Sequence, residues 1–205
     1  MVYLMAEYYM FNKPRGCISA CIDPRHKTVM DYFPKDLRDE LFHIGRLDKD
    51  TEGLLIISDD GALCNRLMMP QNGVRKTYFF WALGDLSEES IKKIERGVNI
   101  FENDDFITSP AELTVLKKAK LLEIKQFLTE DDIKIARRRG EMTVTSGKIT
   151  ITEGKKHQVK KMIGFAGCRV LYLKRISIGL LSLDETLLPG EYRPLTKEEL
   201  ILLES

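Results

Sequence analysis

The sequence predicts an α+β fold built on a mixed, largely antiparallel sheet that is flanked by helices. Segments with the alternation of β-strands outnumber segments with helical spacing, and many of the strand-like segments are joined by short turns. The chain has 205 residues, which is enough for one domain of two lobes, or for two small domains, with a sizeable core.

The first half of the chain mixes strand and helix signals. Pro14 and Gly16 impose a turn after the first strand, and Asp60 is placed to cap a helix. In the segment KTYFFWAL, Tyr78 and Phe80 face one side of a strand and their neighbours face the other side. We expect strands at 7–12, 53–58 and 76–83, a short helix within 31–41 and a helix at 61–68.

The second half continues this mixture. Ser87 opens a helix with an apolar face, and a second helix is expected over 157–166 with Gly167 as its stop. Thr196 and Glu199 form a capping box for a last helix. Further strands are expected near 110–116, 119–127, 141–145, 148–152, 169–174 and 176–182.

Composition excludes several classes of protein. The chain is 43% hydrophobic and 31% charged, without a signal-peptide pattern or an apolar run of membrane-spanning length. We therefore expect a cytoplasmic protein with no membrane partner. The four cysteines form no CxxC pair and no zinc set with the histidines, and Ile149 follows Lys148 where a P-loop requires Ser or Thr. We expect free thiols and neither a zinc site nor a P-loop.

Positive charge gathers in one part of the chain. The net charge is only +1, but the stretch from Glu153 to Arg175 holds seven Lys or Arg against a single acid. Within it, Lys156 and Lys160 lie one helical turn apart, and His157 and Lys161 form a second such pair. Free backbone N–H groups at a helix start, beside cations, favour phosphate binding. The alternative is a solvated basic helix face.

The segment GRLDKDTEG, residues 45–53, carries the most functional information, because it sets charges against a buried strand. Its acids approach the spacing of a calcium loop. However, Ile56 stands where a ligand or its water is usual, and residues 53–58 read as a strand. Two interpretations stay open. The segment is a turn with solvated charges, or it holds Asp48 as a nucleophilic or general-base aspartate.

Five segments, in order, resemble the RsuA-like family of pseudouridine synthases. They are NKPRG (12–16), GRLDKDTEGLLIISDDG (45–61), RKTYFF (75–80), EGKKHQVKKM (153–162) and LPGEYRPLT (188–196). The resemblance covers the chain from about residue 8 to the end, and HQVKKM and GEYRPL are nearer to the branch acting on small-subunit (16S) ribosomal RNA. It implies the pseudouridine synthase catalytic fold, with two lobes around a central cleft. It also implies isomerisation of a uridine in ribosomal RNA to pseudouridine, without cofactor or metal.

The resemblance assigns three catalytic residues. The family's aspartate falls on Asp48, which would attack C1′ of the ribose or remove a proton from C2′, and both routes stay open. The motif tyrosine falls on Tyr78, whose ring would stack on the target base for ~1–3 kcal/mol; a core tyrosine is the alternative. The basic residue falls on Lys160, which would pair with Asp48 for ~4 kcal/mol at a separation of about 4 Å and an effective dielectric of about 20.

Contacts to RNA are expected from basic side chains near these residues. Arg46 shares a face with Asp48 if the segment is extended, where it would contact the phosphate backbone or support the helix once the uridine has left it. The other candidates for phosphate contacts are Lys13, Lys156, His157 and Lys161.

Two departures from the family pattern affect the choice of substrate. Relatives often carry an S4-type RNA-binding domain ahead of this motif, but only eleven residues precede Asn12, so we expect no S4 domain over 1–205. Residues 129–146 look like an insertion, in which Arg137, Arg138 and Arg139 either contact RNA or belong to a solvated helical turn. The expected partner is ribosomal RNA or a ribosome assembly intermediate, and the expected state is a monomer. The alternatives are a 23S target and a non-catalytic RNA- or ribosome-binding protein.

Overall fold

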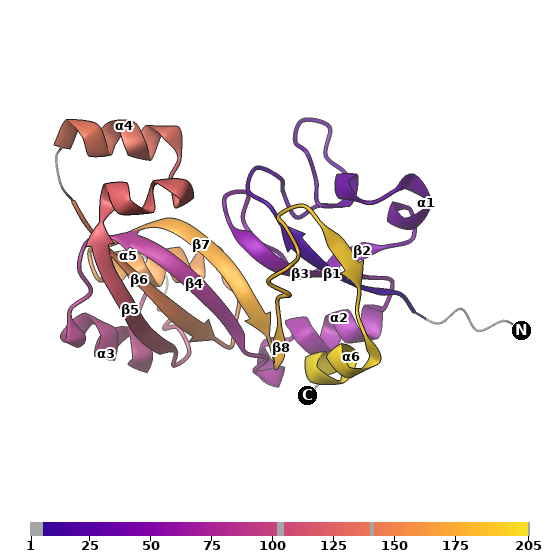
Figure 1. Cartoon of the computed structure of the whole chain (residues 1–205). Helices are drawn as coiled ribbons and strands as arrows, with labels where there is room; N and C mark the ends of the chain where they lie inside the picture. The colour runs from indigo at the N-terminus through magenta and orange to yellow at the C-terminus, as the bar shows by residue number, and fades with distance from the viewer. Residues whose placement is uncertain (1–5, 102–104, 140–141, 205) are drawn as a thin grey trace, which may run out of the picture. The chain divides into compact units, whose positions relative to one another are not determined.

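The computed structural model describes residues 6–101, 105–139 and 142–204 (Figure 1). The chain divides into two compact units: unit 1 comprises residues 1–76 and 174–205, and unit 2 comprises residues 77–173. Strand β7 (Arg169–Ile178) contributes to the sheets of both units, whereas β4 (Lys76–Leu83) belongs to unit 2 except for its first residue, Lys76.

Unit 1 holds a sheet in the order β7-β3-β1-β9. The pairs β1–β3, β1–β9, β2–β3 and β7–β8 are antiparallel, whereas β3 and β7 are parallel, with Glu52 opposite Lys174 and Gly53 opposite Arg175. Besides β7, its elements are β1 (Tyr8–Lys13), η1 (Met30–Tyr32), α1 (Lys35–Arg38), β2 (Phe42–Ile44), β3 (Glu52–Ser58), α2 (Gly61–Met68), η2 (Pro70–Asn72), β8 (Leu181–Ser182), β9 (Tyr192–Pro194) and α6 (Lys197–Glu204).

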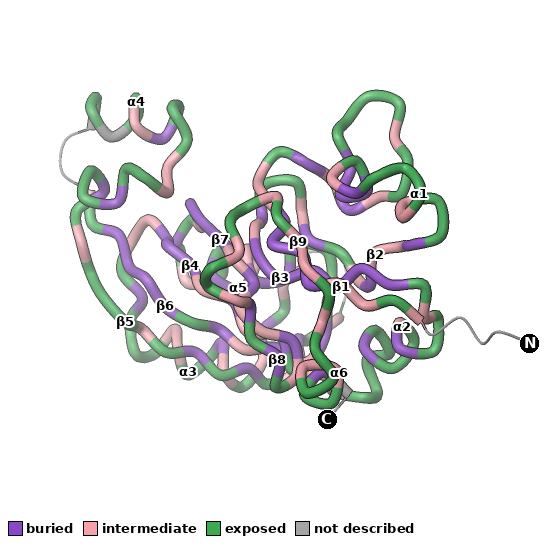
Figure 2. Tube along the Cα trace, turned by 45° about the vertical axis from the view of Figure 1, so that its right-hand side comes forward, coloured by how far each residue is buried: buried purple, intermediate pink, exposed green. Residues whose placement is uncertain are grey.

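One face of this sheet packs on helices α2 and α6 (Figure 1). Met10 lies opposite Ile56 in the β1–β3 ladder, and both belong to a buried cluster with leucines from the two helices. Because side chains alternate along a strand, the neighbouring residue Phe11 faces the other way. It lies there in an aromatic cluster, in which the rings of Phe33 and Tyr192 stack with centroids 4.0 Å apart. The sheet of unit 1 thus has apolar side chains on both faces. The run of buried residues along β3 agrees with this, because successive residues of a strand point to opposite faces (Figure 2).

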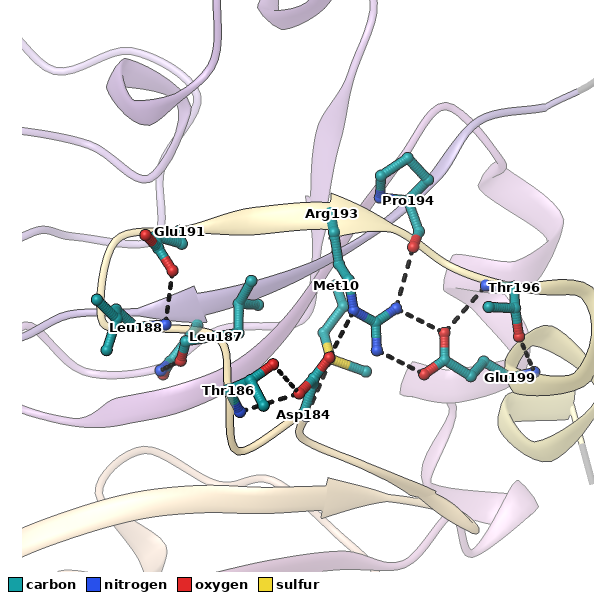
Figure 3. A network of polar contacts seen from close by, with 11 residues as sticks. Met10, Asp184, Thr186, Leu187, Leu188, Glu191, Arg193, Pro194, Thr196 and Glu199 are labelled. Carbon is teal, nitrogen blue, oxygen red and sulfur yellow. Dashed lines mark hydrogen bonds and ion pairs between the residues drawn. The ribbon is translucent and has the colours of Figure 1, made fainter.

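The last segment of the chain is tied down by Arg193 (Figure 3). Its guanidinium donates to Asp184 over 2.8 Å and to the two carboxylate oxygens of Glu199 over 2.8 and 2.7 Å. Thr196 and Glu199 exchange hydrogen bonds between side chains and backbone, which confirms the predicted capping box. Donors from Thr186 and from Arg193 lower the pKa of Asp184 to about 2.

Unit 2 holds a sheet in the order β5-β6-β4-β7, with β5 and β6 antiparallel. Side chains of β4 alternate as predicted. On one side, Trp81 joins a cluster with the 3₁₀-helix η3 and with Tyr172. On the other side, the ring of Phe80 lies where a side chain at Gly147 of β6 would stand. Besides β4 and β7, the elements are α3 (Glu88–Arg96), β5 (Glu112–Lys120), η3 (Leu121–Phe127), α4 (Glu130–Arg139), β6 (Thr143–Ile151) and α5 (Gln158–Phe165).

The mixed sheet flanked by helices confirms the predicted fold class. The caps at Asp60 and Ser87 are confirmed, since both side chains accept hydrogen bonds from the first turn of their helices. The helix expected over 157–166 is confirmed as α5, and Gly167, which follows it, has a φ of +75°. One domain of two lobes, and an insertion over 129–146, stay predictions.

Several predicted elements were wrong. The strand expected at 119–127 ends at Lys120, and the following residues form η3, because Leu121 and Ile124 reach the core at three-residue spacing. The strand pairs expected within 141–152 and 169–182 are the continuous strands β6 and β7, the latter followed by the short β8. Within 31–41, where a short helix was expected, the structure has the short helix α1, which Pro34 separates from η1.

Sequence periodicity did not predict β2 and β9, whereas α4 falls in the segment for which a solvated helical turn was one of the two alternatives. The first two have three residues each, which is too short for any periodicity to show. No helix in the described ranges is long and apolar enough to span a membrane.

Candidate active site

The loop that carries Asp48 connects β2 to β3 in unit 1 and is held in place from several sides. Gly45 starts it with a φ of +75°. Leu47 exchanges two backbone-to-side-chain hydrogen bonds with Ser19, over 2.9 and 3.0 Å. The N–H of Thr51 donates to the carbonyl of Asp48 over 3.0 Å, which closes a turn. Asp48 itself is half-buried and Arg46 is exposed, so an ordered backbone carries both of these charges.

Lys13 supports this loop from the protein interior. Its side chain is completely buried, and its ammonium group donates hydrogen bonds to backbone carbonyls. The Nζ atom lies 3.0 Å from the carbonyl oxygen of Asp48, 2.9 Å from that of Thr51 and 3.0 Å from that of Pro14. Burial lowers the pKa of Lys13, although Cys17 and acids of the loop oppose the shift. This position corrects the expectation that Lys13 contacts a phosphate, since an ammonium without solvent access cannot reach one.

Gly53 brings β7 against the start of β3. Its φ is +104°, and a Cβ there would lie 2.2 Å from the carbonyl oxygen of Arg175. Arg175 is itself buried and donates from Nε to the carbonyl of Leu54 over 2.7 Å, while its Nη2 has no hydrogen-bond partner among the described residues. The approach of the two strands therefore depends on the absence of a side chain at Gly53.

A second buried cation lies near Arg175. Lys76 donates from Nζ to the carbonyl of Val74 over 3.1 Å. Burial, with the charge of Arg175 as the smaller cause, lowers the pKa of Lys76 to about 8. Sequence reasoning missed Lys76 and Arg175. The sequence did offer a signal, because it places a lysine and an arginine in strands that are otherwise largely apolar. Charged side chains are almost never fully buried unless they are paired, so cations in such places indicate an unusual environment.

Tyr78 lies on β4 in unit 2 and is 7% exposed. It shares a face of the strand with Phe80, which is fully buried. The ring of Tyr78 is therefore fixed by its strand, which suits a stacking partner and equally suits a core side chain.

The turn before α5 is built by a buried Glu153 and a buried Gln158. One carboxylate oxygen of Glu153 accepts from Ser109 N–H over 2.8 Å and from Gln158 Nε2 over 2.7 Å. The side-chain oxygen of Gln158 accepts from the backbone N–H of Lys155 over 2.9 Å. His157, the residue before α5, has a φ of +56°, which a residue with a side chain adopts at a cost. The first turn of α5 thus has a fixed and strained entry.

The predicted basic residues gather around this turn. Lys156 and His157 are exposed, whereas Lys160 and Lys161 are half-buried. The Nζ atom of Lys161 lies 3.7 Å from the centre of the Phe101 ring. The structure therefore brings the four predicted basic residues of unit 2 together at one helix start, and that start is suited to bind phosphate.

The candidate residues belong to two units. Asp48 and Arg46 lie in unit 1, whereas Tyr78 and Lys160 lie in unit 2. Unit 1 supplies an aspartate on a stiff loop, and unit 2 supplies an aromatic ring and a group of cations. In the described residues, no three His, Cys, Asp or Glu side chains gather as a metal site would require.

Comparisons with known proteins match most of the chain. The model of a family described as RNA pseudouridylate synthase matches residues 7–164. An uncharacterized RNA pseudouridine synthase of Bacillus subtilis (strain 168), YtzG, is 45% identical over 96% of this chain and 72% of that protein. The ribosomal small subunit pseudouridine synthase A of Yersinia pestis is 35% identical over 95% of this chain and 71% of that protein. A crystal structure of a pseudouridylate synthase, 32% identical, covers 97% of this chain and 74% of that chain with a TM-score of 0.78.

Proposed function

The chain belongs to the RNA pseudouridylate synthase family and is thus an RNA-modifying isomerase, and we propose that it converts one specific uridine of small-subunit (16S) ribosomal RNA into pseudouridine. The reaction breaks the bond between N1 of uracil and C1′ of the ribose, turns the base and joins C5 to C1′. The proton on C5 is released and N1 gains one, so the product is an isomer of the substrate.

Asp48 is the catalytic carboxylate of this proposal. It attacks C1′ or removes the proton from C2′, and either route needs an ionised oxygen at a fixed place. The observation that carries the proposal is the ordered loop: Asp48 has its backbone carbonyl on the buried ammonium of Lys13 and on the N–H of Thr51. A rigid backbone lowers the entropy cost of bringing the carboxylate to the ribose.

Tyr78 and Lys160 act on the same nucleotide in this proposal. The ring of Tyr78 stacks on the released uracil, which keeps the base in place while it turns. Lys160 pairs with Asp48 in this proposal and supplies positive charge to the reacting centre. The half-buried position of Lys160 at the start of α5 supports this role, because a partly desolvated cation acts more strongly than one in water.

Basic residues that are exposed or half-buried hold the RNA. Arg46 contacts the backbone beside the extruded uridine, and Lys156, His157 and Lys161 contact phosphates at the start of α5. Extruding a base costs a few kcal/mol, which these contacts offset. Lys13 is left out of this set because of its burial.

Tritium release from RNA labelled at C5 of uridine tests the chemistry. Asp48→Asn keeps the size of the side chain and the hydrogen bonds of the Asp48 backbone carbonyl but removes the charge, so we expect release to be abolished while RNA binding stays. Asp50→Asn, the same change two residues further along in the loop, is the matched control and should keep its activity. Release by Asp48→Asn at the wild-type rate would refute the role of Asp48.

The choice of RNA requires a separate measurement. Pseudouridines are mapped in ribosomal RNA from a strain lacking the gene, and the missing site is then restored in vitro. The substrates offered are free 16S RNA, a small-subunit assembly intermediate and 23S RNA. Loss and restoration of one 16S site supports the proposal, and loss of a 23S site replaces it with a large-subunit target. No change at any site would favour a binding protein without turnover.

A further inference from the structure

A hairpin in unit 2 lies against the start of α5. Its arms, residues 97–101 and 105–108, are joined by a bridge between Asn99 and Ile107. Val98 and Thr108 exchange hydrogen bonds over 3.0 Å, through a backbone carbonyl and a side-chain hydroxyl. Gly97 allows this closeness, since a Cβ there would lie 2.2 Å from the carbonyl oxygen of Thr108. The hairpin arms therefore have a defined position. The hydrogen bond from the N–H of Ser109 to Glu153 connects them to the turn before α5.

Each arm places one aromatic ring under a lysine. The rings of Phe101 and Phe106 meet edge to face with centroids 5.9 Å apart. The ammonium of Lys161 lies 3.7 Å from the centre of the Phe101 ring, and that of Lys155 lies 4.6 Å from the centre of the Phe106 ring. Both distances are within the range of a cation–π interaction. Two flexible cations on either side of the first turn of α5 are thus fixed by one pair of rings.

The rings fix these lysines without cancelling their charge. A carboxylate partner would hold an ammonium and neutralise it, whereas a ring attracts it through its quadrupole and leaves the full charge available. Neither Lys155 nor Lys161 has an ion-pair partner within the described ranges. The acid next to them, Glu153, uses one oxygen for Ser109 and Gln158. The site therefore keeps two ordered positive charges for a partner from outside.

We propose that Phe101 and Phe106 are positioning residues for substrate binding, which hold Lys161 and Lys155 as a preformed pair that receives the phosphodiester backbone of the RNA. The inference rests on the proposed function, because it takes RNA as the anion. An unrestrained lysine loses up to ~2 kcal/mol of side-chain entropy when it is fixed. The rings reduce this cost in advance, and the ammonium keeps its N–H donors for phosphate oxygens.

Equilibrium binding of a fragment of the mapped target RNA, followed by fluorescence anisotropy, tests the role of the rings. An exposed cation–π interaction corresponds to a change in Kd of about two- to five-fold. We expect Phe101→Leu to weaken binding by this factor, and Phe101→Tyr, which keeps the ring, to restore it. Phe165→Leu makes the same change at the far end of α5, where the ring is 48% exposed, and should leave Kd unchanged.

A double-mutant cycle separates positioning from a structural effect. In a Lys161→Gln background, Phe101→Leu should have no further effect on Kd, because its cation is gone. Lys161→Gln alone should lower the slope of log K against log salt by about 1. An unrelated RNA of equal length should show the same losses, since phosphates carry no sequence information.

Three results would overturn the inference. The first is that Phe101→Leu and Lys161→Gln have additive effects on Kd. The second is tighter RNA binding by Phe101→Leu, which would mean that the hairpin competes with RNA. The third is an equal loss of RNA affinity in Phe101→Leu and Phe165→Leu. Tritium release by the same variants keeps the two proposals apart. At saturating RNA the Phe101→Leu rate should equal that of the wild type, whereas an inactive wild type that still shows the coupling would refute the reaction and leave the binding site standing.

Discussion

Replacement of Lys13 by methionine tests how the Asp48 loop is held. The change removes an ammonium that donates to the carbonyls of Pro14, Asp48 and Thr51 and fills the same space with an apolar chain. The carbonyl of Asp48 keeps the N–H of Thr51 as a donor, and that of Pro14 keeps the thiol of Cys17.

The loss is therefore nearer ~1 kcal/mol for each of these two carbonyls, and between ~1 and ~3 kcal/mol for that of Thr51. Together the three amount to about 3–5 kcal/mol. Removal of a buried charge offsets part of this cost, since burial lowers the pKa of Lys13. We expect the free energy of unfolding to fall by about 2–3 kcal/mol, measured by urea titration.

The effect on the reaction should be larger than the effect on folding. A displacement of about 1 Å in a catalytic group costs roughly 100-fold in rate. We expect tritium release at saturating RNA to fall by about that factor in Lys13→Met, with little change in KM. Lys49→Met, in the exposed part of the same loop, is the control and should change neither quantity. If Lys13→Met matched Lys49→Met in both measurements, the supporting role of Lys13 would be refuted.

Two further predictions concern pH. The pKa of Lys76 is lowered from 10.5 to about 8. The burial of its charge therefore destabilises the folded protein fully below about pH 8, and this destabilisation is gone above pH 10.5. Lys76→Met should be more stable than the wild type at neutral pH by ~1 kcal/mol. Urea titrations at rising pH should show this advantage vanish, and a gap that does not depend on pH would contradict the prediction. The pKa of Asp184 is lowered from 3.8 to about 2, so its stabilising contribution is complete above 3.8 and is lost as the pH falls through 2. The wild type should therefore be more stable than Asp184→Asn at neutral pH and lose that lead in acid, whereas an equal lead at both ends would count against the network around Arg193.

The features that the sequence predicted correctly are local ones. A cap needs only one side chain and the two or three residues after it, which is why Asp60, Ser87 and the Thr196–Glu199 box were found. The alternation around Tyr78 is likewise contained in a few residues. Short elements such as β2 and β9 have no pattern of their own and exist because β3 and β1 offer them hydrogen bonds.

Of the candidate site, only the segments that carry sequence motifs could be predicted. The motifs identified the Asp48 loop and the start of α5, but not which cations face solvent. Lys13 and Lys156 both stand in basic motifs, yet one is buried under a loop and the other is exposed. The difference comes from tertiary packing, since Lys13 ends a strand opposite Gly53, where the loop carbonyls converge. The rings of Phe101 and Phe106 were missed for the same reason, because their contact with α5 joins segments far apart in the chain.

The discontinuity of unit 1 has a consequence for biosynthesis. Arg175 donates to Leu54 across 121 positions of sequence, and β9 pairs with the first strand. A ribosome must therefore translate past unit 2 before the segment beside Asp48 finds its neighbours, whereas unit 2 is continuous and is ready earlier. A nascent chain halted at that point carries the aspartate without the strand that braces it, so catalytic competence arises only after β7 and β9 have been translated.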